Sequence, residues 1–107
     1  MKNKILEIAW HNNLSHLGSY FSAAGIIDEI FKTKKKDDIF ILSSGHAAVA
    51  LYAALEKYSG KNALELFEKH GGHPHRDEDN EIYCSTGSLG MGITVAVGRA
   101  LADRNRN

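Results

Sequence analysis

Apolar residues recur along most of this chain at the spacing of helices, and one short segment is continuously apolar. Lys4 to Asn12 carries its apolar residues on one stripe, which predicts an amphipathic helix. Residues 13–20 break that pattern and indicate a loop. A second helix is predicted after a Ser22 N-cap, because apolar residues then repeat at intervals of three and four. These residues are Ala23, Ile26, Ile27, Ile30 and Phe31.

The continuously apolar segment, residues 39–42, predicts a strand buried on both faces of a parallel sheet. Residues 47–58 follow it and are apolar on nearly every side, so we expect a deeply buried helix that ends at Gly60. This order of strand and helix is typical of an α/β fold. A single strand cannot form a sheet. We therefore expect residues 1–107 to be one partial, helix-rich α/β domain that stops before most of its strands.

The second half of the chain predicts two more helices and a loop between them. Asn62 begins a capping pattern for a short helix that ends near Lys69. Residues 71–80 are polar and contain the only proline, which predicts a surface loop. A last helix is predicted over residues 91–103.

Composition narrows the function classes. The formal net charge is zero, so we expect neither nucleic acid nor an anionic membrane surface as a partner. No apolar run approaches the ~20 residues that a membrane-spanning helix needs. Cys84 is the single cysteine, so an internal disulfide is excluded and the cytoplasm is the expected compartment.

Three histidines stand beside or close to glycines in predicted loops or at the start of a helix: His16, His46 and His73. An imidazole titrates near neutral pH and can transfer protons, and neighbouring glycines allow a ligand to approach. One such histidine would be interpreted as a surface residue, whereas three in the same context favour a site. The other histidines are interpreted as structural or solvated; they are His11, His70 and His75.

Two further segments fit a ligand site. Residues 43–46 (Ser-Ser-Gly-His) come directly after the predicted strand, where α/β folds bind their ligands. Residues 85–92 combine glycines and hydroxyls with one bulky apolar residue, Leu89, before the last helix. Glycines allow close approach and a helix start offers free N–H groups, so this segment predicts a binding loop in which Leu89 meets a flat ligand.

A metal site is an alternative interpretation of the region around the predicted loop. Three histidines occur there at short spacing, with two aspartates and the cysteine nearby. The spacing matches no familiar zinc pattern, and the proline restricts the geometry. The residues in question are His70, His73, His75, Asp77, Asp79 and Cys84.

Four segments in this order resemble the N-terminal part of the transketolase family, and most closely the N-terminal subunit of the split transketolases of prokaryotes. They are residues 15–24, 38–47, 71–74 and 85–92. The resemblance implies a transferase that uses thiamine diphosphate to move a two-carbon ketol unit between sugars in carbohydrate metabolism.

The resemblance also implies roles for particular residues. His46 would approach the cofactor diphosphate, while His16 and His73 would act as catalytic residues that orient sugar hydroxyls and assist proton transfer. Gly87, Ser88 and Leu89 would line the cofactor, with Leu89 against its aminopyrimidine ring.

The chain lacks two parts of the family pattern. The Gly-Asp-Gly metal motif and the pyrimidine-binding domain with its activating glutamate are absent from these 107 residues. No metal ligand is therefore assigned here, and a divalent ion, Mg²⁺ or Ca²⁺, would take its ligands from elsewhere. We expect the chain to be inactive alone and to work in a homo- or hetero-oligomer with a complementary transketolase chain or C-terminal subunit.

A non-catalytic alternative remains at this point. A truncated relative could keep the start of the fold and serve as an interaction module, with apolar surface exposed where strands are missing. Retention of the three glycine-flanked histidines favours the enzyme, because an interaction module has no chemical use for them.

Overall fold

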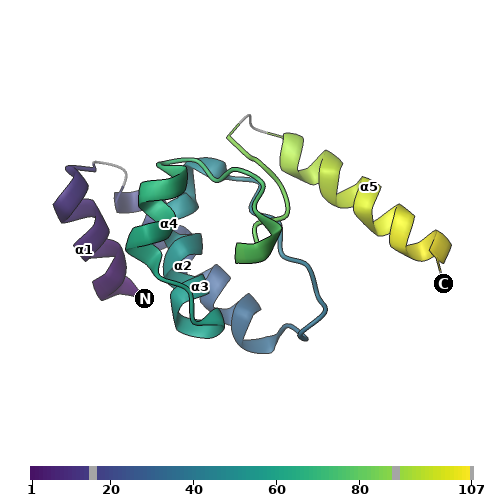
Figure 1. The fold of residues 1–107 in the computed structure, drawn as a ribbon, viewed down its shortest axis with the longest axis horizontal. Coiled ribbons are helices and arrows are strands. Elements are labelled where there is room, and N and C mark those ends of the chain that lie inside the picture. Colours follow the sequence, from purple (N-terminus) through teal and green to yellow (C-terminus); the bar gives the residue numbers. More distant parts are fainter. Residues whose placement is uncertain (15–16, 88–89, 107) are drawn as a thin grey trace.

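Seven helical segments make up the part of the chain described in this computed structural model, which covers residues 1–14, 17–87 and 90–106 (Figure 1). In chain order they are α1 (Lys2–Asn12), α2 (Leu17–Thr33), the 3-10 turn η1 (Gly45–Ala47), α3 (Ala48–Ser59), α4 (Ala63–His70), the 3-10 turn η2 (Glu78–Asn80) and α5 (Met91–Arg106). The predicted helix-rich character is confirmed.

Helix α3 is the centre of the core, and α1, α2 and α4 pack around it. Every residue from Ala48 to Leu55 is buried, so the prediction of a deeply buried helix is confirmed. Four of these eight residues are alanines, whose small side chains allow neighbouring helices to approach closely. Gly60 ends the helix in the left-handed conformation, with φ of 69°, and its N–H donates to the carbonyl of Leu55.

Helix α2 begins six residues earlier than predicted, at Leu17 instead of Ala23. Residues 17–20 belong to the helix, and Ser22 lies within it and does not cap it. The buried positions are Tyr20, Ala24, Ile27 and Phe31, which again recur at intervals of three and four. This stripe includes Tyr20 and leaves Ile26 66% exposed, so the predicted face was rotated away from the true one.

The predicted strand at residues 39–42 is wrong for the described structure. The segment is half-buried and has neither regular secondary structure nor a β-ladder partner among the described residues. Extended backbone becomes a strand only when a neighbouring segment takes up its N–H and C=O groups. Ile39 and Ile41 instead line a cavity of about 300 Å³ beside Ala96 and Ala100 of α5.

Helix α4 begins at the predicted cap, and the loop that follows it is fixed by a buried residue and a backbone bridge. The Asn62 side chain accepts a hydrogen bond from the Glu65 N–H at 3.1 Å, which confirms the predicted cap. The loop after α4 is polar, as expected, but it is anchored: Pro74 is fully buried and Asp77 forms an antiparallel bridge with Ile82. The prediction of a surface loop therefore holds for most of residues 71–80, with Pro74 as its buried exception.

Helix α5 extends away from α1–α4, and its far end carries the C-terminus (Figure 1). Several of its large apolar side chains are at least 40% exposed: Met91, Ile93, Val95, Val97 and Leu101. Its start is held to the rest of the chain, because a methyl group on Gly92 would lie 2.6 Å from the Ser43 Cα. None of the described helices is long and apolar enough to cross a membrane.

Candidate functional site

A cavity of about 490 Å³ lies between the first turns of α2 and the η1 turn. Its walls combine small and hydroxyl-bearing residues with one imidazole: Gly18, Ser19, Ser22, Ala23, Ile26, Ser44, His46 and Ala47. His46 is exposed to this space, and the cavity volume falls in the range typical of small-molecule sites. The structure thus joins the segment that follows His16 in sequence to the segment that contains His46.

Gly45 brings a third segment to the same place. A methyl group at Gly45 would lie 2.5 Å from the Thr86 carbonyl oxygen and 2.6 Å from the Gly87 nitrogen. Real carbon atoms do not approach backbone so closely, so only glycine allows this contact. We call this contact of Gly45 with Thr86 and Gly87 the glycine junction.

The other side of the glycine junction holds His73. A methyl group built on Gly87 would lie 3.0 Å from the His73 Cδ2, so the imidazole rests against this glycine. The chain is held there by the Thr86 N–H, which donates to the Pro74 carbonyl at 3.2 Å. The Arg76 N–H also donates to the Ser85 Oγ at 2.7 Å. Segments 73–76 and 85–87 therefore lie side by side, and the glycine junction connects them to His46.

Thr86 belongs to the predicted binding loop of residues 85–92, although no particular role was predicted for its side chain. Its side chain is buried, and its Oγ1 has no hydrogen-bond partner among the described residues. A buried hydroxyl without a partner costs about 1–3 kcal/mol, so such atoms are rare in native proteins, and a bound ligand is one way to satisfy them. The contact of Thr86 with Gly45 could not be predicted from the sequence, where Thr86 is one of several small polar residues.

Asp77 closes the loop that carries His73. Its Oδ2 accepts hydrogen bonds from the Asn80 Nδ2 at 2.7 Å, the Lys69 Nζ at 2.8 Å and the His70 Nε2 at 3.1 Å. These hydrogen bonds, first that of Asn80 and then that of Lys69, hold the pKa of the Asp77 carboxyl well below its usual range. The carboxylate is therefore ionised at neutral pH.

Acid should weaken the fold through this carboxylate. Because its folded pKa is depressed, its stabilisation is fully present above about pH 4 and is lost as the pH falls further. Asp77→Asn should lower the unfolding free energy by about 1–3 kcal/mol at pH 7, and the difference from wild type should shrink below pH 4. Urea unfolding of both proteins between pH 7 and pH 2 measures this. Parallel pH profiles would contradict the assignment.

The alternative metal site is not supported. Among the described residues, no group of three histidine, cysteine, aspartate or glutamate side chains is placed to hold a metal ion. The physical reason lies at His70, whose Nδ1 accepts from the His75 N–H at 3.2 Å while its Nε2 contacts Asp77. Both ring nitrogens are occupied, so this buried histidine is structural, as the sequence indicated.

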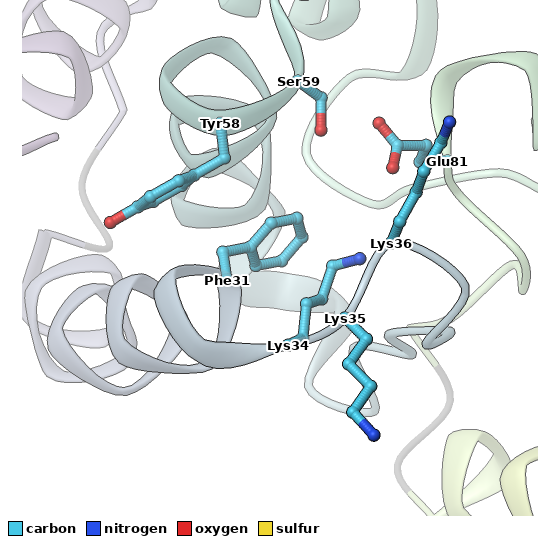
Figure 2. Close-up of a pocket in the computed structure, with 7 residues that line it drawn as sticks. All are labelled: Phe31, Lys34, Lys35, Lys36, Tyr58, Ser59 and Glu81. Carbon is cyan, nitrogen blue, oxygen red and sulfur yellow. The ribbon is translucent and has the colours of Figure 1, made fainter.

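A second cavity, of about 340 Å³, lies where α2 and α3 end (Figure 2). It is lined by Phe31, Lys34, Lys35, Lys36, Tyr58, Ser59 and Glu81. Lys34 is already engaged, because its Nζ donates to the Asp38 carbonyl at 3.1 Å and lies over the Phe31 ring. Lysines at this position offset the negative ends of the helices. The cavity contains none of the predicted site residues, and we assign it no ligand.

Three of the predicted site residues lie outside the described residues: His16, Ser88 and Leu89. Their roles stay predictions. The described members of the predicted site are His46, His73 and Gly87, and the structure brings all three to the glycine junction or to the cavity beside it.

Comparison with known proteins finds relatives of this chain in one family. The family described as "Transketolase, thiamine diphosphate binding domain" matches residues 12–107. "Transketolase 2" of Vibrio parahaemolyticus is 34% identical over 94% of this chain, and "Transketolase 2" of Aliivibrio fischeri is 33% identical over the same share. "Transketolase" of Cereibacter sphaeroides is 36% identical over 65% of the chain. No solved structure matches.

These relatives are much longer than this chain. The matched region makes up 14% of each of the first two relatives and 12% of the third. The chain therefore corresponds to a small part of the full-length proteins.

Proposed function

Because this chain belongs to the transketolase family of thiamine diphosphate-binding domains, we propose that it forms the diphosphate side of the cofactor site in a transketolase-like transferase. The proposed reaction moves a two-carbon ketol unit from one sugar to another. The complete enzyme would carry the parallel sheet of an α/β fold, of which residues 39–42 would form one strand.

The observation that carries the proposal is the glycine junction. Gly45 approaches Thr86 and Gly87 so closely that no side chain fits between them, and it stands directly before His46. His73 packs on the far side against Gly87. The exposed imidazoles of His46 and His73 therefore lie on either side of the glycine junction, where no side chain covers the backbone. This arrangement suits a ligand that combines a charged group with hydroxyl groups.

The residues present fit thiamine diphosphate. The cavity at His46 is large enough for a small molecule, and the buried Thr86 hydroxyl has no hydrogen-bond partner in the described part of the chain. In the proposed site, His46 contacts the diphosphate, and Gly87, Ser88 and Leu89 line the cofactor. The cofactor, when bound, supplies the carbanion chemistry, and the protein supplies position and polarity.

The catalytic assignments remain those that the family resemblance implies. His16 and His73 would orient the sugar hydroxyls and move protons between them and the bound substrate. An exposed imidazole such as that of His73 can perform both tasks at neutral pH, because it carries a donor and an acceptor in its neutral form.

The remainder of the site would come from outside these residues. A divalent metal ion would take its ligands from a complementary transketolase chain or C-terminal subunit, since the described residues offer no such set. The exposed apolar side chains of α5 favour such assembly, because they would gain from contact with further strands. The backbone of residues 39–42 favours it too, since it has no β-ladder partner within the described part of the chain. A reducing cytoplasm is the compartment that fits the free thiol of Cys84.

A chimera tests the proposal. This chain would replace the matched segment of the Vibrio parahaemolyticus relative, and calorimetry would measure its affinity for thiamine diphosphate with Mg²⁺. The chimera should bind the cofactor and transfer ketol units, whereas the 107-residue chain alone should do neither. His46→Ala in the chimera should weaken binding tenfold or more, because a hydrogen bond to a charged group is lost.

The matched control is His11→Ala, since His11 is exposed on α1, away from the glycine junction. It should leave the affinity unchanged. A chimera with native circular dichroism that binds no cofactor would contradict the proposal, and so would equal effects of the His46 and His11 substitutions.

A further inference from the structure

The loop that carries His73 is held at both ends by one buried imidazole. His70 is the last residue of α4, and its side chain is 3% exposed. Its Nδ1 accepts a hydrogen bond from the His75 N–H at 3.2 Å, and its Nε2 lies 3.1 Å from the Asp77 Oδ2. We call His70, the His75 amide and the Asp77 carboxylate the His70 clamp.

The His70 clamp determines which ring nitrogen carries the proton. A backbone N–H can only donate, so the Nδ1 that accepts from it is unprotonated. In the neutral ring the proton then resides on Nε2 and is donated to the ionised Asp77 carboxylate. The ring is also stacked between Tyr52 and His75, at centroid distances of 6.2 Å and 6.0 Å.

Asp77 links the clamp to the chain beyond the loop. Lys69 and Asn80 donate to the same Oδ2, and the Asp77 backbone pairs with Ile82 through hydrogen bonds of 2.7 Å and 3.0 Å. The loop therefore starts at a helix end and finishes at a small antiparallel bridge, with the imidazole connecting the two.

The residues inside this loop are those that meet the glycine junction. The Pro74 carbonyl receives the Thr86 N–H, and the His73 ring lies on Gly87. The loop begins with Gly71 and Gly72, which contribute little stiffness of their own, and Gly71 has φ of 74°. The position of His73 therefore depends on what holds the two ends of the loop.

We propose that His70 is a positioning residue: its hydrogen bonds to the His75 amide and to Asp77 place His73 against Gly87. Its purpose, to present His73 to a sugar, rests on the function proposed above. The geometric claim stands on the clamp alone, so the two can fail separately.

The first test measures the tautomer in the 107-residue chain. Long-range ¹H–¹⁵N correlation spectra near pH 8 should show His70 protonated at Nε2 and unprotonated at Nδ1. A proton on Nδ1 would overturn the proposal, because that nitrogen could not then accept from His75. This measurement requires neither cofactor nor a variant.

The second test follows His73 directly. The wild-type chain should show a nuclear Overhauser effect between the His73 Hδ2 and a Gly87 Hα. His70→Phe keeps an aromatic ring but removes both hydrogen bonds, and it should lose this signal. His70→Gln can supply one donor and one acceptor, and it should retain at least half of the signal. Persistence in His70→Phe, or loss in both variants, would overturn the proposal.

Two controls separate positioning from a general loss of structure. His75→Ala keeps the backbone N–H that the clamp uses, so it should retain the signal between His73 and Gly87. The edge-to-face pair of Phe31 and Phe40, with centroids 5.2 Å apart, should give its own signals in every variant. A chimera without transferase activity would contradict the proposed function and leave these spectra unchanged.

Discussion

Replacing Gly45 by alanine is expected to lower the unfolding free energy by about 3 kcal/mol and to separate His46 from the segment that contains Gly87. The added methyl group would lie 2.5 Å from the Thr86 carbonyl oxygen and 2.6 Å from the Gly87 nitrogen. Both neighbours are backbone atoms, so relief requires the chain to move and not merely a side chain. Urea unfolding monitored by circular dichroism measures the loss.

The matched control is Gly25→Ala. Gly25 lies on the exposed side of α2, and an added methyl group there would meet nothing within 4 Å. Because alanine favours a helix interior over glycine, this variant should be more stable by about 0.5–1 kcal/mol. The same chemical change should thus have opposite signs at the two positions. An equal effect at both would show that the glycine junction is not closely packed.

Replacing Tyr52 by alanine is expected to cost about 3–5 kcal/mol, enough to unfold much of a small domain. Tyr52 is fully buried in α3, its ring contacts Phe67 and His70, and its hydroxyl donates to the Gly71 carbonyl at 2.8 Å. Burial raises the pKa of this phenol far above neutral, so the hydroxyl remains a donor at working pH. Thermal and urea unfolding both report the loss.

Tyr52→Phe separates the two contributions. It keeps the ring and its packing, and it removes only the hydrogen bond to Gly71, so it should cost about 1 kcal/mol. If Tyr52→Phe proved as damaging as Tyr52→Ala, the hydrogen bond to Gly71 would dominate and the packing argument would be wrong.

Local sequence signals predicted the helices whose ends are marked by side chains. Gly60 ends α3 because glycine adopts the left-handed conformation without steric cost, and Asn62 begins α4 because its carboxamide satisfies the Glu65 N–H. The start of α2 was missed because residues 17–20 offer no comparable local signal. Tyr20 is recruited to the helix by burial against the core, which is a tertiary effect.

The segment at residues 39–42 shows why a strand is harder to predict than a helix. A helix satisfies its own backbone, so the apolar pattern of α3 was sufficient evidence. A strand depends on a second segment, and the described residues provide none for this one. The continuous apolar run predicted burial on both faces, whereas all four residues are half-buried in the described structure, and the run could not supply a partner segment.

The candidate site, like the fold, was predicted from the sequence in part. The family and the candidate site histidines were predicted from short motifs, because a histidine close to a glycine can be recognised in the sequence. That the segments carrying these residues meet at Gly45 could not be predicted, since this depends on a contact between residues about 40 positions apart. The buried Thr86 hydroxyl and the His70 clamp were hidden for the same reason.

By itself the sequence determined the family, the helix-rich character and the ends of α3 and α4, all of which depend on residue types and local spacing. Only the tertiary structure decided which face of α2 is buried, that Pro74 lies in the interior, and that His46 and His73 flank one glycine junction. Packing depends on contacts between segments that are distant in the chain. The sequence of one segment alone does not show which other segment its backbone will contact.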